Sequence, residues 1–199
     1  MNSSKILSIF PLILDELYEF IDCFFSCIPG RTGRLLRLLY FSILFRQFLT
    51  VNIGKNVCIR GVKGITFGHR VMIGDNCFIS ARSGGKIVIG DNVSLNMSCH
   101  VNADVNGTII LGSDSIYGPS CLFRASNHQF GPLISPKYLP HDHGSIVIGE
   151  GVWSGAYVVF LKGASVSPYS VVGASALVSK SFSERSVLVG IPASVNRLL

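Results

Sequence analysis

Acid–base chemistry in this sequence points first to His128, which immediately precedes an irregular segment, residues 129–145. A neutral imidazole, with a pKa of about 6.5, can take a proton from a hydroxyl group at cellular pH and return it to a leaving group. A lone histidine is more often structural than catalytic, and its position at the break between a regular pattern and an outward loop makes His128 the one to weigh as a catalytic residue. We therefore identify His128 as the candidate general base.

The other candidates for chemistry are weaker. His69 and His100 are interpreted as solvated corner residues. Asp142 could orient an imidazole, but solvation within the loop is the favoured interpretation. No serine or cysteine lies in a recognisable nucleophile motif, so the sequence favours direct attack within a ternary complex over an acyl-enzyme.

A short repeat must position these residues. From residue 53 onward it consists of an aliphatic residue, a glycine, two polar residues and a small or branched residue, as in Ile73-Gly74-Asp75-Asn76-Cys77. Late in the chain the aliphatic position recurs every six residues without a break, at Ile148, Ser154, Phe160, Val166, Val172 and Val178. This period fits neither one face of an α-helix nor a hairpin meander, and a β-sandwich does not explain the unbroken register. It predicts a solenoid of short strands and tight corners.

A second inward position of the repeat calls for small side chains, because three walls converge there. It is held by Val57, Val71, Cys77, Val93, Cys99, Val105, Cys121, Val152, Val158, Ala164 and Ala176. The six cysteines include no C-x-x-C pair. We interpret them as reduced core thiols of a cytosolic protein, with a disulfide framework as the alternative.

The repeat also sets the organisation of the chain. The predicted parts are an N-terminal segment over residues 1–50, a solenoid over residues 51–183 with an outward loop at 129–145, and a tail over residues 184–199. The first segment lacks the repeat, and Arg31, Arg34 and Arg37 share one face of a predicted helix. We interpret it as a helical cap on the solenoid, and a basic amphipathic segment resting on anionic lipid is the alternative. Its apolar runs are too short to span a membrane, and it shows no clear signal peptide.

Composition narrows the class of protein. Hydrophobic residues make up 48% and charged residues 14%, which excludes a disordered chain. The net charge of +6 favours an anionic partner, such as nucleic acid, a membrane surface or a phosphorylated small molecule. The sign of the charge does not choose among the three.

The final coils carry a resemblance to a known family. Residues 148–180, with Leu161-Lys162-Gly163 at their centre, look like the closing coils of the hexapeptide-repeat acyltransferases, and Gly190-Ile191-Pro192-Ala193 followed by Arg197 is similar to the usual tail. Within that family the arrangement most resembles sugar and polysaccharide O-acetyltransferases, including bacterial O-antigen and capsule enzymes. The resemblance covers roughly residues 52–197. It implies a mostly β fold, a left-handed parallel β-helix with an N-terminal helical segment.

The resemblance also implies a function and a site. It implies a cytoplasmic homotrimer with active sites at the subunit interfaces, where an acetyl group passes from acetyl-CoA to a sugar hydroxyl, with no metal and no nucleic acid involved. His128 matches the catalytic histidine. The positions matching acetyl-CoA contacts are Trp153, Gly155, Ala156, Ala174, Ser179, Lys180 and Arg197, and the candidates for holding the acceptor are Ser98, Asn127 and Asp142.

Two departures and three rival functions accompany the resemblance. Ser98 replaces a frequent asparagine, and His141 occupies the neighbourhood of a carboxylate, so acceptor choice and the residue that orients His128 stay open. The rivals are acetylation of an antibiotic or amino sugar, a non-catalytic scaffold, and a zinc enzyme of the β-helical carbonic anhydrase type. His69, His100 and His128 do not match the ligand arrangement of that last class.

Overall fold

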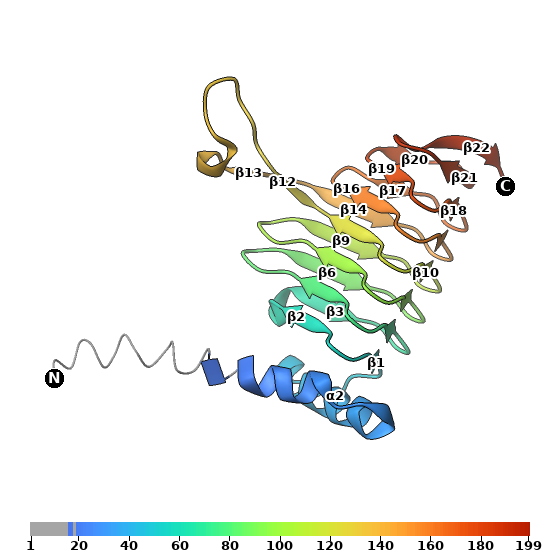
Figure 1. Ribbon diagram of the computed structural model, residues 1–199. Coiled ribbons are helices and arrows are strands. Elements are labelled where there is room, and N and C mark those ends of the chain that lie inside the picture. Colours follow the sequence, from blue (N-terminus) through green and yellow to red (C-terminus); the bar gives the residue numbers. More distant parts are fainter. Residues whose placement is uncertain (1–15, 18) are drawn as a thin grey trace.

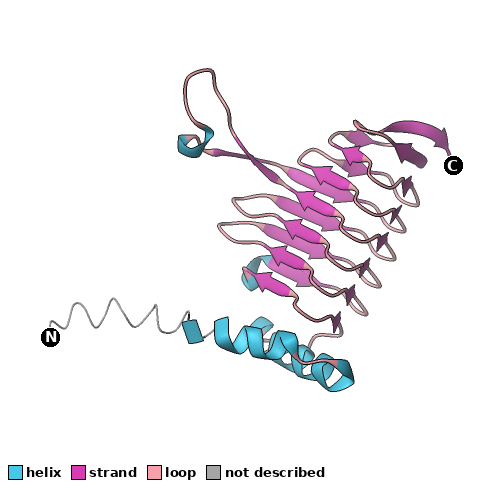
Figure 2. Ribbon diagram, in the orientation of Figure 1, coloured by secondary structure: helices cyan, strands magenta, loops and turns pink. Residues whose placement is uncertain are grey.

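The chain folds as a three-sided prism of stacked coils with helices at its N-terminal end (Figure 1). The computed structural model describes residues 16–17 and 19–199. The strands of successive coils pair in parallel, and helices occur chiefly in the cap (Figure 2). This architecture confirms the predicted fold class, a left-handed parallel β-helix with an N-terminal helical segment.

Three sheets form the walls of the prism, and each coil passes through sheets A, B and C in turn. Sheet A contains β1 (Asn52–Ile53), β4 (Met72–Ile73), β7 (Ser94–Leu95), β10 (Ile116–Tyr117), β15 (Trp153–Ser154), β18 (Val171–Val172), β21 (Ser186–Val189) and the antiparallel β22 (Ser194–Leu198). Sheet B contains β2 (Cys58–Arg60), β5 (Phe78–Ser80), β8 (His100–Asn102), β11 (Leu122–Arg124), β16 (Val159–Leu161) and β19 (Leu177–Val178). Sheet C contains β3 (Ile65–Phe67), β6 (Lys86–Ile89), β9 (Thr108–Leu111), β14 (Ser145–Ile148), β17 (Ser165–Val166) and β20 (Ser181–Phe182).

The residues of the six-residue period fill the interior of the prism. Every member of the series from Ile148 to Val178 is buried. Midway along the prism, the rings of Phe123 and Phe160 stack with centroids 4.7 Å apart, and Tyr117 meets Phe123 edge-on at 5.0 Å. The repeat therefore works as predicted, because each inward side chain packs on its counterpart one coil away.

The second inward position is small as predicted, with one exception. Cys77, Cys99 and Cys121 are buried at the turns from sheet A to sheet B, and the thiol of Cys121 donates to the carbonyl of Gly155 at 3.2 Å. Val105 is instead half-buried at φ +60° in the turn between β8 and β9, because that turn leaves the six-residue register. The interpretation of all six cysteines as core thiols is wrong for Cys23 and Cys27, which are exposed on the cap.

The cap consists of helical residues 19–27 and α2 (Gly30–Phe45), which lie across the first coil (Figure 1). Arg37 is only 2% exposed, and it donates from Nε to the carbonyl of Ile53 at 2.9 Å and from Nη1 to the carbonyl of Ile28 at 2.7 Å. Arg37 therefore ties the cap to the first strand. No helix in the described part of the chain is long and apolar enough to cross a bilayer.

The turns of successive coils stack into edges of the prism. At the edge between sheets B and C, which we call the B–C edge, Gly61 lies against Ala81, Gly85 against Ala103, and Gly107 against Ala125. The predicted outward loop leaves this edge in the fourth coil. It is an antiparallel pair, β12 (Ser126–His128) and β13 (His141–His143), joined by residues 129–140 with a short 3₁₀ helix, η2 (Pro136–Tyr138). We call residues 126–143 the arm.

Candidate active site

The arm brings two imidazole rings together. His128 ends β12, His141 begins β13, and the two residues are direct partners in the antiparallel register. Their ring centroids are 4.2 Å apart, because the side chains of directly paired residues lie on the same face of a strand pair. His128 is exposed and His141 is half-buried. An accessible imidazole thus rests on a second, more sheltered one.

His141 carries a ring nitrogen with unused hydrogen-bonding capacity. Its Nδ1 atom is buried, and no other described residue supplies it with a hydrogen-bond partner. A buried polar atom without a partner is uncommon in folded proteins and costs stability. His100 Nε2 and Tyr117 Oη share this property among the described residues, and His141 Nδ1 is the one of the three whose ring contacts His128.

Asn127 and Asp142 lie on the other face of the arm. They pair with each other in register, one position away from the two histidines, and neighbouring residues of a strand point to opposite faces. The carboxylate of Asp142 forms an ion pair with Lys162, in the turn that follows β16. The structure therefore uses Asp142 to hold the base of the arm, and His141 is the residue that contacts His128.

The residues expected to contact acetyl-CoA fall into two groups. Trp153 is 56% exposed on β15, and Gly155 and Ala156 follow it at the A–B edge, the stacked turns between sheets A and B. Ala174 lies one coil above, so close that a Cβ on Gly155 would stand 2.7 Å from the Ala174 amide nitrogen. Ser98 lies at the same edge two coils below Ala156, exposed and with φ +60°.

The second group lies elsewhere on the prism. Ser179 and Lys180 are exposed at the B–C edge, two coils beyond the arm, and the ammonium group of Lys180 lies 5.5 Å from the ring centroid of Phe182. Arg197 is exposed on β22, at the C-terminal end of sheet A. One chain therefore places His128 on a different edge from Ser98, Ala156 and Ala174.

The remaining histidines have structural surroundings. His69 Nδ1 lies 3.0 Å from the hydroxyl of Thr50 at an exposed corner, as predicted. His100 differs from the prediction, because it lies on β8, half-buried, with its ring edge-on to Phe78 at 4.6 Å. Burial lowers the pKa of His100, and Arg124 lowers it further. Among the described residues, no group of three or more His, Cys, Asp and Glu side chains is arranged to hold a metal ion.

Sequence reasoning missed two partners in this site. His141 was noted only as a departure from a pattern, although its place at the far end of a proline-bounded loop is what pairs it with His128. Lys162 belongs to the Leu161-Lys162-Gly163 motif, which was used only to identify the family resemblance. Its contact with Asp142 depends on the fold of the arm and could not be read from that motif. If the outward loop had been predicted as a hairpin, the pairing of His128 with His141 across it would have identified His141.

Comparisons with known proteins agree with this fold. No protein-family model matches the chain. It is 32% identical over 129 residues to the galactoside O-acetyltransferase of Lactococcus lactis, and 34% identical over 73 residues to WbbJ of Escherichia coli, named for O-acetyl transfer in lipopolysaccharide biosynthesis. The matches cover 63% and 37% of this chain, and the chain spans 61% and 37% of the relatives' lengths.

Solved structures show the same architecture. One is a variant of AntD, an N-acyltransferase of Bacillus cereus in complex with dTDP-4-amino-4,6-dideoxyglucose and coenzyme A, with a TM-score of 0.65, 22% identity, and coverage of 75% of this chain and 80% of that one. Another is a hexapeptide-repeat acetyltransferase of Vibrio cholerae with acetyl-CoA, with a TM-score of 0.51, 22% identity, and coverage of 81% and 77%. These likenesses confirm the β-helix and the resemblance to the hexapeptide-repeat acyltransferases.

Proposed function

For a chain that resembles the hexapeptide-repeat acyltransferases in sequence and fold, we propose acetyl transfer from acetyl-CoA to a sugar hydroxyl of a surface polysaccharide or its precursor. The observation that carries this proposal is the exposed imidazole of His128, resting on His141 at the base of an outward arm. Both curated relatives are named O-acetyltransferases, which supports an oxygen atom as the acceptor of the acetyl group. Acetyl-CoA or coenzyme A bound to proteins of this fold supports the donor.

The proposed reaction is a direct transfer in which His128 acts as general base. Its neutral imidazole takes the proton of the acceptor hydroxyl while the oxygen attacks the thioester carbonyl. The C–S bond then breaks, the acetyl group stays on the sugar oxygen, and the imidazolium returns its proton to the thiolate of coenzyme A. The protein ends unchanged, so no acyl-enzyme is needed.

His141 is proposed to position His128 and Asp142 to hold the arm. The buried Nδ1 of His141 and the short distance between the two rings support the first role. The ion pair between Asp142 and Lys162 supports the second. A positioned imidazole needs less reorganisation to reach the geometry of proton transfer.

A homotrimer is proposed as the working form. Acetyl-CoA contacts are expected at Trp153, Ala156 and Ala174, which lie on a different edge from His128. A second copy that brings its A–B edge against the arm would place its acetyl-CoA contacts beside His128. Three copies in a closed ring would repeat this interface three times. We propose the cytoplasm as the location of the reaction, since acetyl-CoA is the proposed donor.

Contact with the surface of a membrane is proposed for the cap. Leu35, Leu39 and Ile43 form an exposed apolar stripe along α2, and Arg31 and Arg34 are exposed beside its first turn. Apolar and basic side chains on one exposed helix favour binding to anionic lipid. We expect the wild-type chain to sediment with anionic vesicles and the Leu39→Glu variant to stay in the supernatant. Equal sedimentation of both proteins would contradict the proposed membrane contact.

Acetylation of an antibiotic or an amino sugar is the alternative, and it differs only in the acceptor. AntD, which was solved in complex with an amino sugar nucleotide, supports it at the level of the fold. A non-catalytic scaffold is the second alternative, and it predicts no acetyl-CoA binding.

The proposed function is tested by release of free coenzyme A. The purified chain is mixed with acetyl-CoA and a panel of sugars, amino sugars and nucleotide sugars, and each product is identified by mass spectrometry. Surface glycans from cells with and without the protein are compared in parallel. We expect acceptor-dependent release and an O-acetyl ester; absence of both acetyl-CoA binding and transfer would favour the scaffold.

A further inference from the structure

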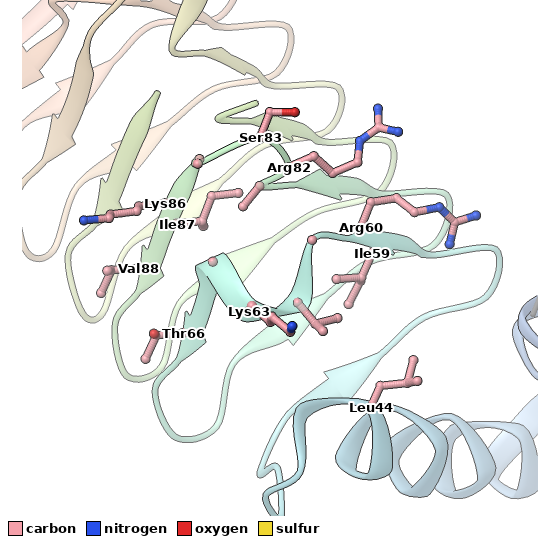
Figure 3. Close-up of a pocket in the computed structure, with 16 residues that line it drawn as sticks. Leu44, Ile59, Arg60, Lys63, Thr66, Arg82, Ser83, Lys86, Ile87 and Val88 are labelled. Carbon is pink, nitrogen blue, oxygen red and sulfur yellow. The ribbon is translucent and has the colours of Figure 1, made fainter. Parts of the chain in front are cut away.

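A cavity of about 880 Å³ opens at the N-terminal end of the B–C edge (Figure 3). Its walls are the turns of the first two coils, including η1 (Val62–Gly64) and residues 81–85, and it extends to Leu44 on α2. None of the residues discussed above as contacts of acetyl-CoA lines it. It is therefore separate from the expected donor site.

Positive charge dominates this cavity. Its lining includes Arg60, Lys63, Arg82 and Lys86 and no acidic residue. Arg60 and Arg82 are already engaged with carboxylates, at 3.3 Å from Asp22 and 3.3 Å from Asp104 respectively. Lys63 and Lys86 are exposed, and no carboxylate within the described residues forms an ion pair with either. Two ammonium groups thus remain to attract an anion.

Backbone donors add to this charge. The turn at the rim of the cavity holds Ser83 at φ +51° and Gly84 at φ +83°, and the hydrogen bonds of the described residues include none from either amide N–H. In the neighbouring turn, Gly61 packs so closely that a Cβ there would stand 2.4 Å from the Ala81 carbonyl oxygen. Successive free N–H groups in such turns make concave sites for anions.

Apolar side chains supply the other walls. Leu44, Val62 and Val88 line the cavity, and Val88 is 42% exposed. A cavity with a basic rim and apolar walls fits a phosphate ester whose other part is planar or hydrocarbon. The two exposed ammonium groups attract an anionic ligand more strongly than an uncharged sugar.

The position of the cavity connects it to the arm. Gly85, Ala103 and Ala125 stack at successive levels of the B–C edge, so the base of the arm lies two coils above the cavity. Strands of neighbouring coils are about 4.8 Å apart, which makes this separation about 10 Å. Ser179 and Lys180 lie at the same edge on the other side of the arm.

We propose that this cavity binds the phosphate or diphosphate group of the acceptor, so that the sugar acetylated near His128 is an activated sugar carrying a phosphate ester. This inference rests on the proposed function for the identity of the ligand as acceptor. The shared chemistry is a diphosphate ester, which a soluble sugar nucleotide and a lipid-linked sugar both carry. The donor phosphates and the acceptor phosphates would then lie on opposite sides of the arm.

Binding of diphosphate probes to the full chain tests the proposal. The probes are inorganic pyrophosphate, UDP and a short prenyl diphosphate in detergent micelles, measured by titration calorimetry. The test variant is the double substitution Lys63→Gln and Lys86→Gln, and Lys55→Gln, at an exposed lysine that does not line the cavity, is the control. We expect at least a tenfold loss of affinity in the double variant, no loss in the control, and weaker binding at higher salt.

Stronger binding of UDP would identify a soluble sugar nucleotide, and stronger binding of the prenyl diphosphate a lipid-linked sugar. Equal affinity of the double variant and the wild type, or no binding of any probe to the wild type, would overturn the proposal. As a second measurement, pyrophosphate is expected to protect Lys63 and Lys86 from an amine-modifying reagent; unchanged modification would also count against it.

The two proposals fail in different ways. Acetylation of unphosphorylated sugars without diphosphate binding would leave the proposed function standing and remove the phosphate site. Diphosphate binding with neither acetyl-CoA binding nor transfer would remove the proposed function, and with it the role of the ligand as acceptor. An increase in KM for the phosphorylated acceptor, with KM for acetyl-CoA unchanged in the double variant, would support both.

Discussion

The imidazole of His141 combines a buried, unpartnered Nδ1 atom with a ring contact to His128. Sequence reasoning looked for a carboxylate in this role, and Asp142 was the candidate. The arm places Asp142 on the opposite face, in an ion pair with Lys162. The side chain that can restrain His128 is therefore another histidine, and its contribution can be separated from that of the base.

His141→Ala is expected to lower kcat by about tenfold to a hundredfold and to leave KM for acetyl-CoA little changed, because the base remains present but is less well positioned. His141→Gln, which keeps a polar side chain of similar reach, should recover part of the loss. Steady-state kinetics with both variants measures this. Equal kcat in His141→Ala and the wild type would show that His141 has no positioning role.

His100 gives a prediction about stability and pH. Burial lowers its pKa in the folded state, so the unfolded chain binds its proton at higher pH than the folded chain does. The free energy of unfolding should therefore decrease as the pH falls below the ordinary histidine value of about 6.5, until the lowered pKa is reached. Chemical unfolding at several pH values should show a flatter dependence in His100→Gln than in the wild type. An equal slope in both proteins would contradict the pKa shift.

Among the elements, the strands of the prism and the outward loop were predictable, and the strand pairing within the arm was not. The six-residue period specified the inward residues because packing at the walls of the prism leaves few alternatives, and Cys77, Cys99 and Cys121 followed from the same rule. Pairing of β12 with β13 depends on contacts across a long loop, which no local pattern encodes. Burial of Arg37 likewise depends on carbonyl groups from residues 28 and 53, which only the folded cap brings together.

The arm should be dispensable for folding and necessary for activity. Its loop contributes little to the core, and Phe130 and Leu133 are 90% and 95% exposed. Replacing residues 129–140 with a short Asn-Gly turn is expected to change Tm by only a few degrees, because the coils keep their own packing. Acetyl transfer should fall to background, because the loop is then missing from the site. Thermal melting together with a transfer assay checks both parts, and wild-type activity in the shortened chain would show that residues 129–140 are not part of the site.

At the scale of the whole molecule, the residues of the proposed site are divided between two edges of the prism. The expected acetyl-CoA contacts at Trp153, Ala156 and Ala174 face away from the edge that carries His128. The bulky apolar residues of the arm are open to solvent in the single chain, and a neighbouring copy would cover them. The position of each residue in its coil followed from the sequence, but the assembly depends on surfaces of the complete prism.

Mixed assemblies test the shared site. The chain is expected to sediment as a trimer, and a mixture of His128→Ala with an A–B edge variant such as Ala174→Trp should recover activity that neither protein has alone. Recovery requires that one copy supply the base and another the acetyl-CoA groove. Co-expression with two affinity tags and purification of the mixed species provides the sample. A monomeric active protein, or mixed trimers without activity, would refute this arrangement.

The turnover number of His128→Ala is the most direct test of the central claim, that an imidazole on the arm of a β-helix serves as the base in acetyl transfer. We predict a decrease of about a hundredfold or more with the oligomeric state and acetyl-CoA affinity preserved, because only proton removal is lost. His143→Ala, an exposed histidine of the same arm, is the matched control and should stay close to the wild type. Near-normal turnover in His128→Ala would contradict the account.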